Sequence, residues 1–532
     1  MRRPNARSRN PNSDKVKDMD PIKLHFRPAR PGFRSTNVKR SNPRSRFCLI
    51  TSISVGLALF CYIMLFGNKS ERNKKYGVVI DGGSTGTRIH VFKYEVRNGN
   101  LVLDFTDKGL VSMRVNPGLS AHLDDPDGAG HAISELVQFA KGNVPSDQWG
   151  NTEIRLMATA GMRLLGNEDQ ERILNACRRV LRASGFKFHD DLATVIPGSD
   201  EGLYAWVVAN YALGTLGAEP AQTTGIIELG GASAQVTFIS DEPVPPEFSR
   251  KIKFGNFTYN LYSHSLLQYG QNVAFELLKE SLLLGGQELV AESLQRDPCT
   301  PSGYAHNEDA WKLSPASLVE KNKYLSTLLP SGNFSECRSA SLKLLQKGKD
   351  KCSYNTCYIG STFIPKLQGK FLATENFFHT SKFFRLGERA SLSDLVVAGH
   401  EFCGDDWLKL TQKYKSLDEE DLLRYCFSSA YIVALLHDSL GIDLDDQRIG
   451  YANQVHDIPL DWALGAFILQ SAENLERSHS DWTVSIIGGN SSKLPLVFGI
   501  FFLLIEVLEG EAYVIARQGK IIPGYKLNLV LS

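Results

Sequence analysis

Three common signatures of binding and catalytic sites are missing from this chain. The pattern GxxxxGK[ST] occurs nowhere, which excludes a P-loop nucleotide site. No His or Cys cluster with zinc spacing lies near the Gly-rich segments described next, so zinc chemistry is not expected there. The net charge is +1 over 532 residues, which argues against nucleic acid as a partner. No internal repeat is visible apart from two short Gly-rich segments.

These two segments each follow a strand-like apolar run. Residues 76–88 read YGVVIDGGSTGTR, and residues 225–235 read GIIELGGASAQ. Each run ends in an acid, a glycine pair and a hydroxyl, and glycine leaves the backbone N–H groups uncovered for an anion. Two such loops in one chain predict a phosphate that is held from both sides.

Each loop is expected to lead into a second strand. After the first loop, a β-branched and aromatic run is followed by Asn98-Gly99, a turn pair typical of β-hairpins, and then by LVLDF. The second loop leads into VTFIS. A P-loop or dinucleotide fingerprint needs a helix at this point, so the phosphate is expected in hairpin loops. This arrangement resembles the way in which actin, hexokinase and the 70-kDa chaperones hold ATP.

Residues 82–86, GGSTG, also match the G-x-S-x-G nucleophile elbow of serine hydrolases. That motif requires a helix immediately after the serine. Because a hairpin is expected here, the context argues against a serine nucleophile.

Two further segments lie between the loops. Residues 154–165 form an apolar strand that runs into Thr159, although a lone threonine is more often a helix cap or turn residue. Ser199 is a plausible N-cap, which places Asp200 and Glu201 in the first turn of an amphipathic helix. Acids at a helix start are common because they complement the dipole. A carboxylate that is ionised at neutral pH can also align and activate a water molecule.

With these segments, the chain resembles the nucleoside triphosphate diphosphohydrolases, the apyrase family, and most of all the membrane-anchored plant apyrases. The resemblance runs from about Tyr76 to Gln470. The matching stretches, in the order of the family, are 81–88, 158–165, 198–206, 228–235 and 461–465 (DWALG).

The resemblance implies an α/β, two-lobed, actin-like (ribonuclease H-like) ATPase fold with the nucleotide in the interlobe cleft. It implies hydrolysis of terminal phosphates from nucleoside tri- or diphosphates with Ca²⁺ or Mg²⁺. Lobe I is expected at 76–215, with 458–470 returning to it, and lobe II at 216–455. About 450 residues are enough for two lobes with separate cores.

The resemblance also implies roles for individual residues. Glu201 corresponds to the carboxylate that activates the attacking water, while Asp81 and Glu228 correspond to those that hold the metal, largely through bound waters. Thr159, Ser233 and Gln235 match positions around the water and the terminal phosphate. The nucleotide- and phosphate-binding residues are Asp81, Gly82, Gly83, Ser84, Thr85, Gly86, Thr87, Arg88, Thr159, Glu228, Leu229, Gly230, Gly231, Ala232, Ser233, Ala234 and Gln235.

Two positions depart from the family pattern. The family usually has Asp where this chain has Glu228, and Thr where it has Ala234. The additional methylene of Glu moves the carboxylate outward, which is expected to shift metal geometry or preference.

Other interpretations stay open. An actin-like nucleotide-binding module without turnover would lack the water-activating carboxylate, which is present here. An exopolyphosphatase-like phosphatase shares the lobes and loops, but its relatives are generally soluble and cytosolic. Phe427 and Tyr431 lie in an apolar helical pattern, and belong either to a base-stacking surface or to the core. The preferred nucleotide is left undecided.

The N-terminal segment predicts a membrane anchor. Residues 1–46 hold 14 Lys/Arg against three acids and read as a disordered cytosolic tail. Residues 47–67 are uncharged and long enough to span a bilayer as a signal anchor. The charge bias places the catalytic domain in the lumen or outside the cell, at the Golgi or plasma membrane, as a single-pass type II protein. A cleaved signal peptide would need a shorter tail. Residues 494–508 are either a second span or an interfacial helix.

The cysteines fit an oxidising compartment. Two of the nine lie in the predicted span, and the remaining seven leave one unpaired, with Cys177 as the candidate. The resemblance implies a bridge between Cys403 and Cys426, and the others cannot be paired from sequence. Glycosylation sequons occur at Asn256, Asn333 and Asn490.

Overall fold

The computed structural model describes Gly56 and residues 74–97, 100–106, 109–285, 295–305, 328–355, 357–478 and 484–486. Its contacts divide the chain into two units, 1–70 and 71–532, and the second is described below. The predicted tail (1–46), almost all of the predicted span (47–67), the segment 494–508 and Asn490 lie outside the described residues. Within the described ranges, no helix has the length and apolar content needed to cross a bilayer.

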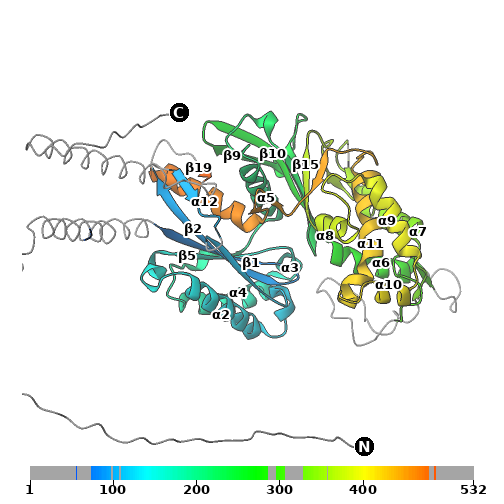
Figure 1. Cartoon of the computed structure of the whole chain (residues 1–532), viewed down its shortest axis with the longest axis horizontal. Coiled ribbons are helices and arrows are strands. Elements are labelled where there is room, and N and C mark those ends of the chain that lie inside the picture. The colour runs from blue at the N-terminus through cyan, green and yellow to red at the C-terminus, as the bar shows by residue number, and fades with distance from the viewer. Residues whose placement is uncertain are drawn as a thin grey trace, which may run out of the picture. The chain divides into compact units, whose positions relative to one another are not determined.

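The first of two main sheets is built largely from the N-terminal part of the unit. Figure 1 shows it with α2 and α4 along one side. Its strands, in spatial order, are β19 (Val484–Ile486), β3 (Asn100–Leu103), β2 (Thr87–Arg97), β1 (Lys75–Gly82), β5 (Glu153–Ala158) and β6 (Ala193–Val195), with β4 (Leu110–Val115) also paired to β2.

The second main sheet has six strands. Figure 1 shows α7, α9, α10 and α11 grouped beside it. Its order is β16 (Ile449–Tyr451), β15 (Phe371–Glu375), β7 (Gly225–Leu229), β8 (Ser233–Ile239), β10 (Phe257–Leu267) and β9 (Ser249–Phe254). The expected α/β class is therefore confirmed as a two-sheet architecture.

The two sheets repeat one strand plan that the sequence does not reveal. In the first, the hairpin β1–β2 continues to an antiparallel β3 on one side and to parallel β5 and β6 on the other. In the second, the hairpin β7–β8 continues to an antiparallel β10 on one side and to parallel β15 and β16 on the other. The repeat therefore extends well beyond the two Gly-rich loops.

Helices and short pairings complete the unit. The helices are α2 (Pro126–Asn143), α3 (Ala160–Arg163), α4 (Asn167–Arg182), α5 (Gly198–Ala212), α6 (Gln271–Gly285), α7 (Phe334–Leu345), α8 (Asn376–Phe383), α9 (Leu392–Gly404), α10 (Trp407–Lys413), α11 (Glu419–Val433) and α12 (Trp462–Ser478). A π-helical turn, Ala434–Ser439, extends α11. The minor strand pairs are β11 (Gln295–Asp297) with β12 (Leu328–Pro330), β13 (Cys357–Ile359) with β14 (Thr362–Phe363), and β17 (Gln454–Val455) with β18 (Ile458–Pro459).

Strand alternation explains how the layers form. Val78 and Ile80 of β1 point into a core shared with α2 and α4, whereas Val79 points into a second core that contains α5 and α12. Ile226 of β7 joins this second core, while Ile227 contributes to a third, on the side of α8 and α11. The helices α5 and α12 therefore lie in an apolar layer that both sheets share.

The crossing of α5 and α12 is unusually close. A Cβ placed on Gly465 would lie 1.9 Å from the backbone oxygen of Tyr204, so glycine is needed at this contact. Phe467 of α12 reaches the first sheet, where it stacks on Phe92 and fills the space above Gly77. The expected return of 458–470 to the first half places α12 on this sheet, and β19 lies there as well. The lobe boundaries themselves stay a prediction.

The disulfides lie in the second half of the fold, which is the part that contains the second sheet and its helices. Cys403–Cys426 is present, as the resemblance implied, and Cys299–Cys337 and Cys352–Cys357 complete the set in the described part of the chain. Cys177 is free and buried, as predicted, and burial raises the pKa of its thiol to about 12.

Candidate active site

The two Gly-rich loops have the same backbone plan. In the first, the last paired residues are Gly82 and Thr87, so four residues connect β1 to β2. In the second, the last paired residues are Leu229 and Ala234, so four residues again lie between them, and the last of these, Ser233, already begins β8. The hairpin interpretation is confirmed at both loops, which removes the helix that a serine nucleophile elbow needs.

The loops lie directly against each other. A Cβ on Gly231 would lie 2.8 Å from the hydroxyl oxygen of Ser84 and 2.8 Å from the methyl carbon of Thr85. Ala160, Ala232 and Val273 form a small buried cluster beside this contact. Two loops that are far apart in sequence therefore meet at Gly231, where the absence of a side chain allows the close contact.

Arginines surround the first loop. Arg114 of β4 donates to the Thr85 hydroxyl at 2.9 Å and to Asn116 Oδ1 at 3.1 Å. Arg88, which is paired across the hairpin with Asp81, contacts Asp461 Oδ2 at 3.3 Å. These contacts place two guanidinium groups next to a loop whose amides are uncovered.

Most contacts of the second loop are with neutral groups, although Arg163 Nη2 also lies 3.3 Å from the Ser233 hydroxyl. At the start of α6, the N–H groups of Gln271 and Asn272 donate to the carbonyls of Gly230 and Gly231, both at 2.9 Å. Asn376, which begins α8, donates through its side chain to the Leu229 carbonyl at 2.8 Å. Backbone and amide bonds therefore hold this loop.

Thr159 occupies the N-cap position of α3 but makes no side-chain cap bond. Its N–H donates to the Gly82 carbonyl at 3.1 Å, and its hydroxyl lies 3.5 Å from the same oxygen. The structure therefore brings Thr159 to the base of the first loop, in the same relation that Asn376 has to the second.

The helix that carries Glu201 begins earlier than expected. Pro197, not Ser199, is the N-cap residue of α5, and Glu201 N–H donates to the Pro197 carbonyl at 3.2 Å. The fixed φ of proline starts the helix, while the Ser199 hydroxyl accepts a hydrogen bond from Arg250 instead. Glu201 stays in the first turn and is 6% exposed.

Arg163 of α3 is the ion-pair partner of Glu201, with Nη2 at 2.8 Å from Oε2. Burial raises the pKa of Glu201, while the Arg163 charge and hydrogen bonds from Arg163 and Gln235 oppose this rise. The Glu201 carboxylate is therefore buried, and Arg163 and Gln235 offset part of the cost of burying its charge.

Asp81 and Glu228 are compensated less: the Arg88 charge opposes part of the rise in the pKa of Asp81, whereas burial and nearby carboxylates all raise the pKa of Glu228. Asp81 Oδ1 and Glu228 Oε2 are buried oxygens without a hydrogen-bond partner in the described structure. Burial raises the pKa of both carboxyls well above the ordinary range, and nearby carboxylates, Glu201 among them, raise it further. Two orphaned carboxylate oxygens at the ends of β1 and β7 are suited to a hard cation.

The described residues do not, however, form a complete cage for a metal ion. No three His, Cys, Asp or Glu side chains of this part of the chain gather closely enough to hold an ion by themselves. Asp81 and Glu228 therefore fit a divalent cation whose remaining ligands are water or substrate oxygens.

Sequence reasoning missed two nearby carboxylates as site residues. Asp461 caps α12 by accepting from the Ala463 N–H at 2.9 Å and also lies 3.3 Å from His90 Nε2. Glu375 ends β15 with φ +57°, a backbone conformation that a non-glycine residue rarely adopts, and its N–H donates to Asn453 Oδ1 at 2.7 Å. Burial raises the pKa of Glu375, and so does Asp461.

Arg114 and Arg163 were also missed. Arg163 lies inside the segment 154–165, but nothing in its spacing points to Glu201, which is 38 positions later. Arg114 lies in an ordinary strand pattern. An ion-pair partner of the predicted carboxylate is visible only after folding.

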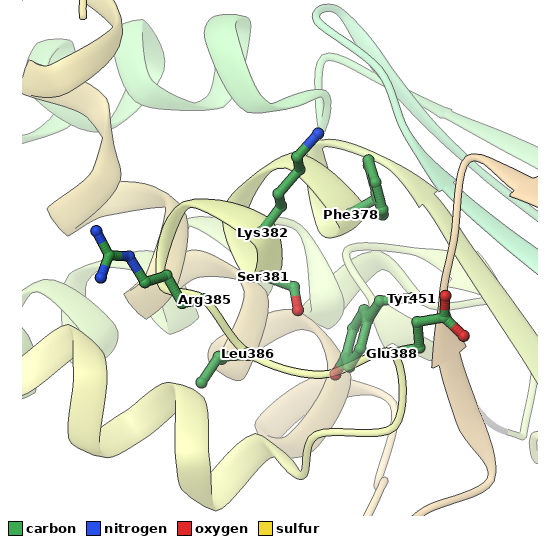
Figure 2. Close-up of a pocket in the computed structure, with 7 residues that line it drawn as sticks. All are labelled: Phe378, Ser381, Lys382, Arg385, Leu386, Glu388 and Tyr451. Atoms are coloured by element: carbon green, nitrogen blue, oxygen red, sulfur yellow. The ribbon is translucent and has the colours of Figure 1, made fainter. Parts of the chain in front are cut away.

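A separate hollow of about 300 Å³ lies between α8 and β16. Its lining residues are Phe378, Ser381, Lys382, Arg385, Leu386, Glu388 and Tyr451, and none of them belongs to the two loops. Figure 2 shows the charged ends of Lys382, Arg385 and Glu388 pointing in different directions. The hollow therefore does not present converging polar groups.

Phe427 and Tyr431 belong to the core. Both are fully buried, and Tyr431 donates its hydroxyl to the Tyr269 carbonyl at 2.8 Å. Of the two interpretations that the sequence left open, the core is confirmed. The sequon residues Asn256 and Asn333 are exposed, and Asn333 also caps α7.

Comparison with known proteins agrees with this geometry. Residues 68–480 match the model of the GDA1/CD39 (nucleoside phosphatase) family. "Probable apyrase 6" from Arabidopsis thaliana is 54% identical over 95% of this chain and 94% of its own length. Ectonucleoside triphosphate diphosphohydrolase 1 from Mus musculus is 28% identical over 81% of this chain and 88% of its own.

The fold is also similar to a solved structure, the nucleoside triphosphate hydrolases from Neospora caninum. The TM-score is 0.56 at 17% identity, and the match covers 81% of this chain and 98% of that one. From the family match over most of its length and the similarity to apyrases, the chain belongs to the GDA1/CD39 family of nucleoside phosphatases.

Proposed function

We propose that this chain hydrolyses the terminal phosphates of nucleoside tri- or diphosphates, and that the two Gly-rich loops hold the phosphates between the two halves of an actin-like fold. Membership of a nucleoside phosphatase family supports the reaction. The observation that carries the proposal is the contact between the loops, where Gly231 lies against Ser84 and Thr85. A phosphate chain bound there meets amides and hydroxyls from both sides.

The first loop supplies charge and hydroxyls to the phosphates. Ser84, Thr85, Gly86 and Thr87 present the hydrogen-bond donors, and Arg88 stands across the hairpin from Asp81. The second loop, Gly230–Ser233, faces the same phosphates with uncovered amides. Phosphoryl transfer depends mainly on positioning and charge neutralisation, so no covalent nucleophile is required.

Glu201 activates the attacking water. Its carboxylate is buried at the first turn of α5, and the Arg163 charge opposes the rise that burial causes in its pKa. Thr159, Ser233 and Gln235 are placed around the water and the terminal phosphate. A water aligned by an ionised carboxylate is a better nucleophile than a free one.

Asp81 and Glu228 would hold Ca²⁺ or Mg²⁺, since each has a buried oxygen without a partner in the described structure. When bound, the divalent ion would neutralise charge on the phosphate oxygens. The two carboxylates would hold it largely through bound water, and a bound cation would offset the burial and mutual repulsion that raise their pKa values.

The enzyme claim is tested with the full-length chain purified in detergent. We expect phosphate release from ATP or ADP that depends on Ca²⁺ or Mg²⁺ and that falls by about 10²–10⁴-fold in Glu201→Gln. Wild-type release no faster than that of Glu201→Gln would leave a nucleotide-binding module without turnover. A panel of ATP, ADP, GDP and UDP identifies the preferred substrate, and inorganic polyphosphate tests the exopolyphosphatase alternative.

The protein is anchored in a membrane through 47–67, with the catalytic unit in the lumen or outside the cell. The uncharged run and the basic tail support this topology. Three disulfides in the described part support an oxidising compartment.

Protease protection of a C-terminal tag in sealed vesicles tests whether 494–508 spans the membrane. Loss of glycan mass in Asn256→Gln or Asn333→Gln tests the exposed sequons.

A further inference from the structure

We propose that Arg163 is a positioning residue that holds Glu201 in its reactive orientation and couples that orientation to the contact between the two halves. The inference rests on the proposed role of Glu201. It concerns a residue that acts through the Glu201 carboxylate.

The guanidinium group of Arg163 is fixed from two directions. Nη2 donates to Glu201 Oε2 at 2.8 Å, and Nη1 donates to the backbone carbonyl of Ile196 at 3.1 Å. The Arg163 and Glu201 side chains are 14% and 8% exposed. Because one nitrogen is held by the backbone, the other presents its proton to Glu201 in a defined direction.

The same nitrogen reaches the second half of the fold. Nη2 lies 3.3 Å from the Ser233 hydroxyl and 3.4 Å from the Ser265 hydroxyl. Gln235 donates to the same two hydroxyls, at 2.6 Å and 3.2 Å. Arg163 of α3 is therefore connected to β8, which leaves the second loop, and to the neighbouring strand β10.

The start of α5 is tightly packed against this network. A Cβ on Gly198 would lie 2.5 Å from the Ser265 hydroxyl and 3.2 Å from Arg163 Cζ, and a Cβ on Gly202 would lie 2.6 Å from the Thr237 hydroxyl. The two glycines let the helix approach β8 and β10 closely. If the distance between the two halves of the fold changed, Glu201 and Arg163 would therefore move together.

The charges around Glu201 explain why a cation is needed there. Asp81, Glu228 and Glu375 face it from β1, β7 and the end of β15, and all three carry acid groups that interact with it. Asp200, the neighbour on α5, is paired with Arg250. Without Arg163, repulsion would turn the Glu201 carboxylate away from the other acids, and the guanidinium prevents this by binding Oε2.

The test uses the full-length protein and ATP or ADP with Mg²⁺. We expect Arg163→Ala to lower kcat by about 10²-fold, because misplacement by about 1 Å costs that much, while KM changes less than about threefold. Arg163→Lys keeps the positive charge but not the forked guanidinium group. Its kcat is expected to lie between those of the wild type and Arg163→Ala. Millimolar guanidinium ion added to Arg163→Ala is expected to restore part of kcat. Arg155→Ala, which removes the Arg155–Glu153 ion pair on β5, is the matched control and leaves kcat unchanged.

A double-mutant cycle separates positioning from a structural role. If Arg163 acts through Glu201, then Arg163→Ala in the Glu201→Gln background costs little further activity, whereas independent roles give additive losses. Additive losses, or full kcat in Arg163→Ala while Glu201→Gln is inactive, overturn the inference and leave the proposed function intact. Full activity in Glu201→Gln overturns the proposed role of Glu201 instead, and with it the basis of the inference, while the phosphate released still shows hydrolysis. If Arg163→Ala does not fold, Arg163→Lys replaces it in the double-mutant cycle. Additive losses would again overturn the inference.

Discussion

The two Gly-rich loops share a backbone plan but differ in the side chains around them. Asp81 faces Arg88 across the first hairpin, whereas Glu228 faces the neutral Gln235 across the second. Arg114 adds a second cation to the first loop, while α6 holds the second loop with backbone N–H groups. The shared backbone plan therefore gives both loops the same geometry, while the residues around them decide how much positive charge lies beside each loop.

The largest effect is expected at Glu201, which belongs to neither loop. Glu201→Gln keeps the size of the side chain but removes the carboxylate that we propose orients the water. We expect a loss of about 10²–10⁴-fold in kcat, measured as phosphate release from ATP. The neighbouring Asp200→Asn, which affects a partly exposed pair with Arg250, serves as the control and is expected to stay within about twofold of wild type.

The contact between the loops is tested with Gly231→Ala. The new Cβ would lie 2.8 Å from both Ser84 Oγ and Thr85 Cγ2, so the loops must separate. We expect kcat/KM for ATP to fall by about 10–100-fold, since separation misplaces groups on both sides of the phosphate. Gly230→Ala places a Cβ 3.2 Å from the Ser233 carbonyl oxygen and should cost less. Equal losses in the two variants would contradict the importance of the contact.

The two acids are compared by exchanging their lengths. Glu228→Asp retracts the second carboxylate and Asp81→Glu extends the first, so the bound cation should move in opposite directions. We expect the ratio of Ca²⁺- to Mg²⁺-supported activity to change by about 3–10-fold, because Mg²⁺ tolerates less distortion than Ca²⁺. Removing the ion with EDTA should abolish phosphate release by every variant. An unchanged ratio in both variants would remove these acids from the cation site.

The helix pair between the sheets is expected to be sensitive to Gly465→Ala. A Cβ would lie 1.9 Å from the Tyr204 carbonyl oxygen, so α5 and α12 must move apart. We expect a loss of about 1–3 kcal/mol in the free energy of unfolding, measured by urea denaturation. Gly142→Ala, in α2 with open space around it, should instead stabilise by about 0.5–1 kcal/mol. Similar effects at both glycines would show that the crossing is not tight.

The smallest effect concerns His264 of β10 in the second half. Burial, and then the charge of Arg250, lowers the pKa of His264 to about 4 in the folded protein. The unfolded chain therefore binds more protons between about pH 6.5 and 4, so the stability that the neutral histidine contributes is complete above pH 6.5 and is lost as the pH falls toward 4. We expect His264→Gln to weaken this decline by about 1 kcal/mol, measured as Tm against pH. An identical decline in the variant would assign it to other groups.

Much of the site could be predicted from local sequence. A strand followed by an acid and glycines is a local pattern, so both loops and their hairpins were found, and Cys177 was identified as unpaired. The start of α5 was placed two residues late because proline and serine compete as helix starters, and only the packing of Arg250 on Ser199 decides between them. Arg163, Glu375 and Asp461 were missed as site residues because each becomes relevant through a partner that is distant in sequence.

By itself, the sequence determined the chemical groups: two acids on two glycine loops, a helix-start carboxylate, and the family. These follow from short patterns whose physical meaning does not depend on distant residues. The tertiary structure alone decided that the two halves repeat one strand plan, that Gly231 meets Ser84, and that Arg163 binds Glu201. Such contacts arise when two sheets pack around α5 and α12, and packing joins residues according to their place in space, which no local pattern encodes.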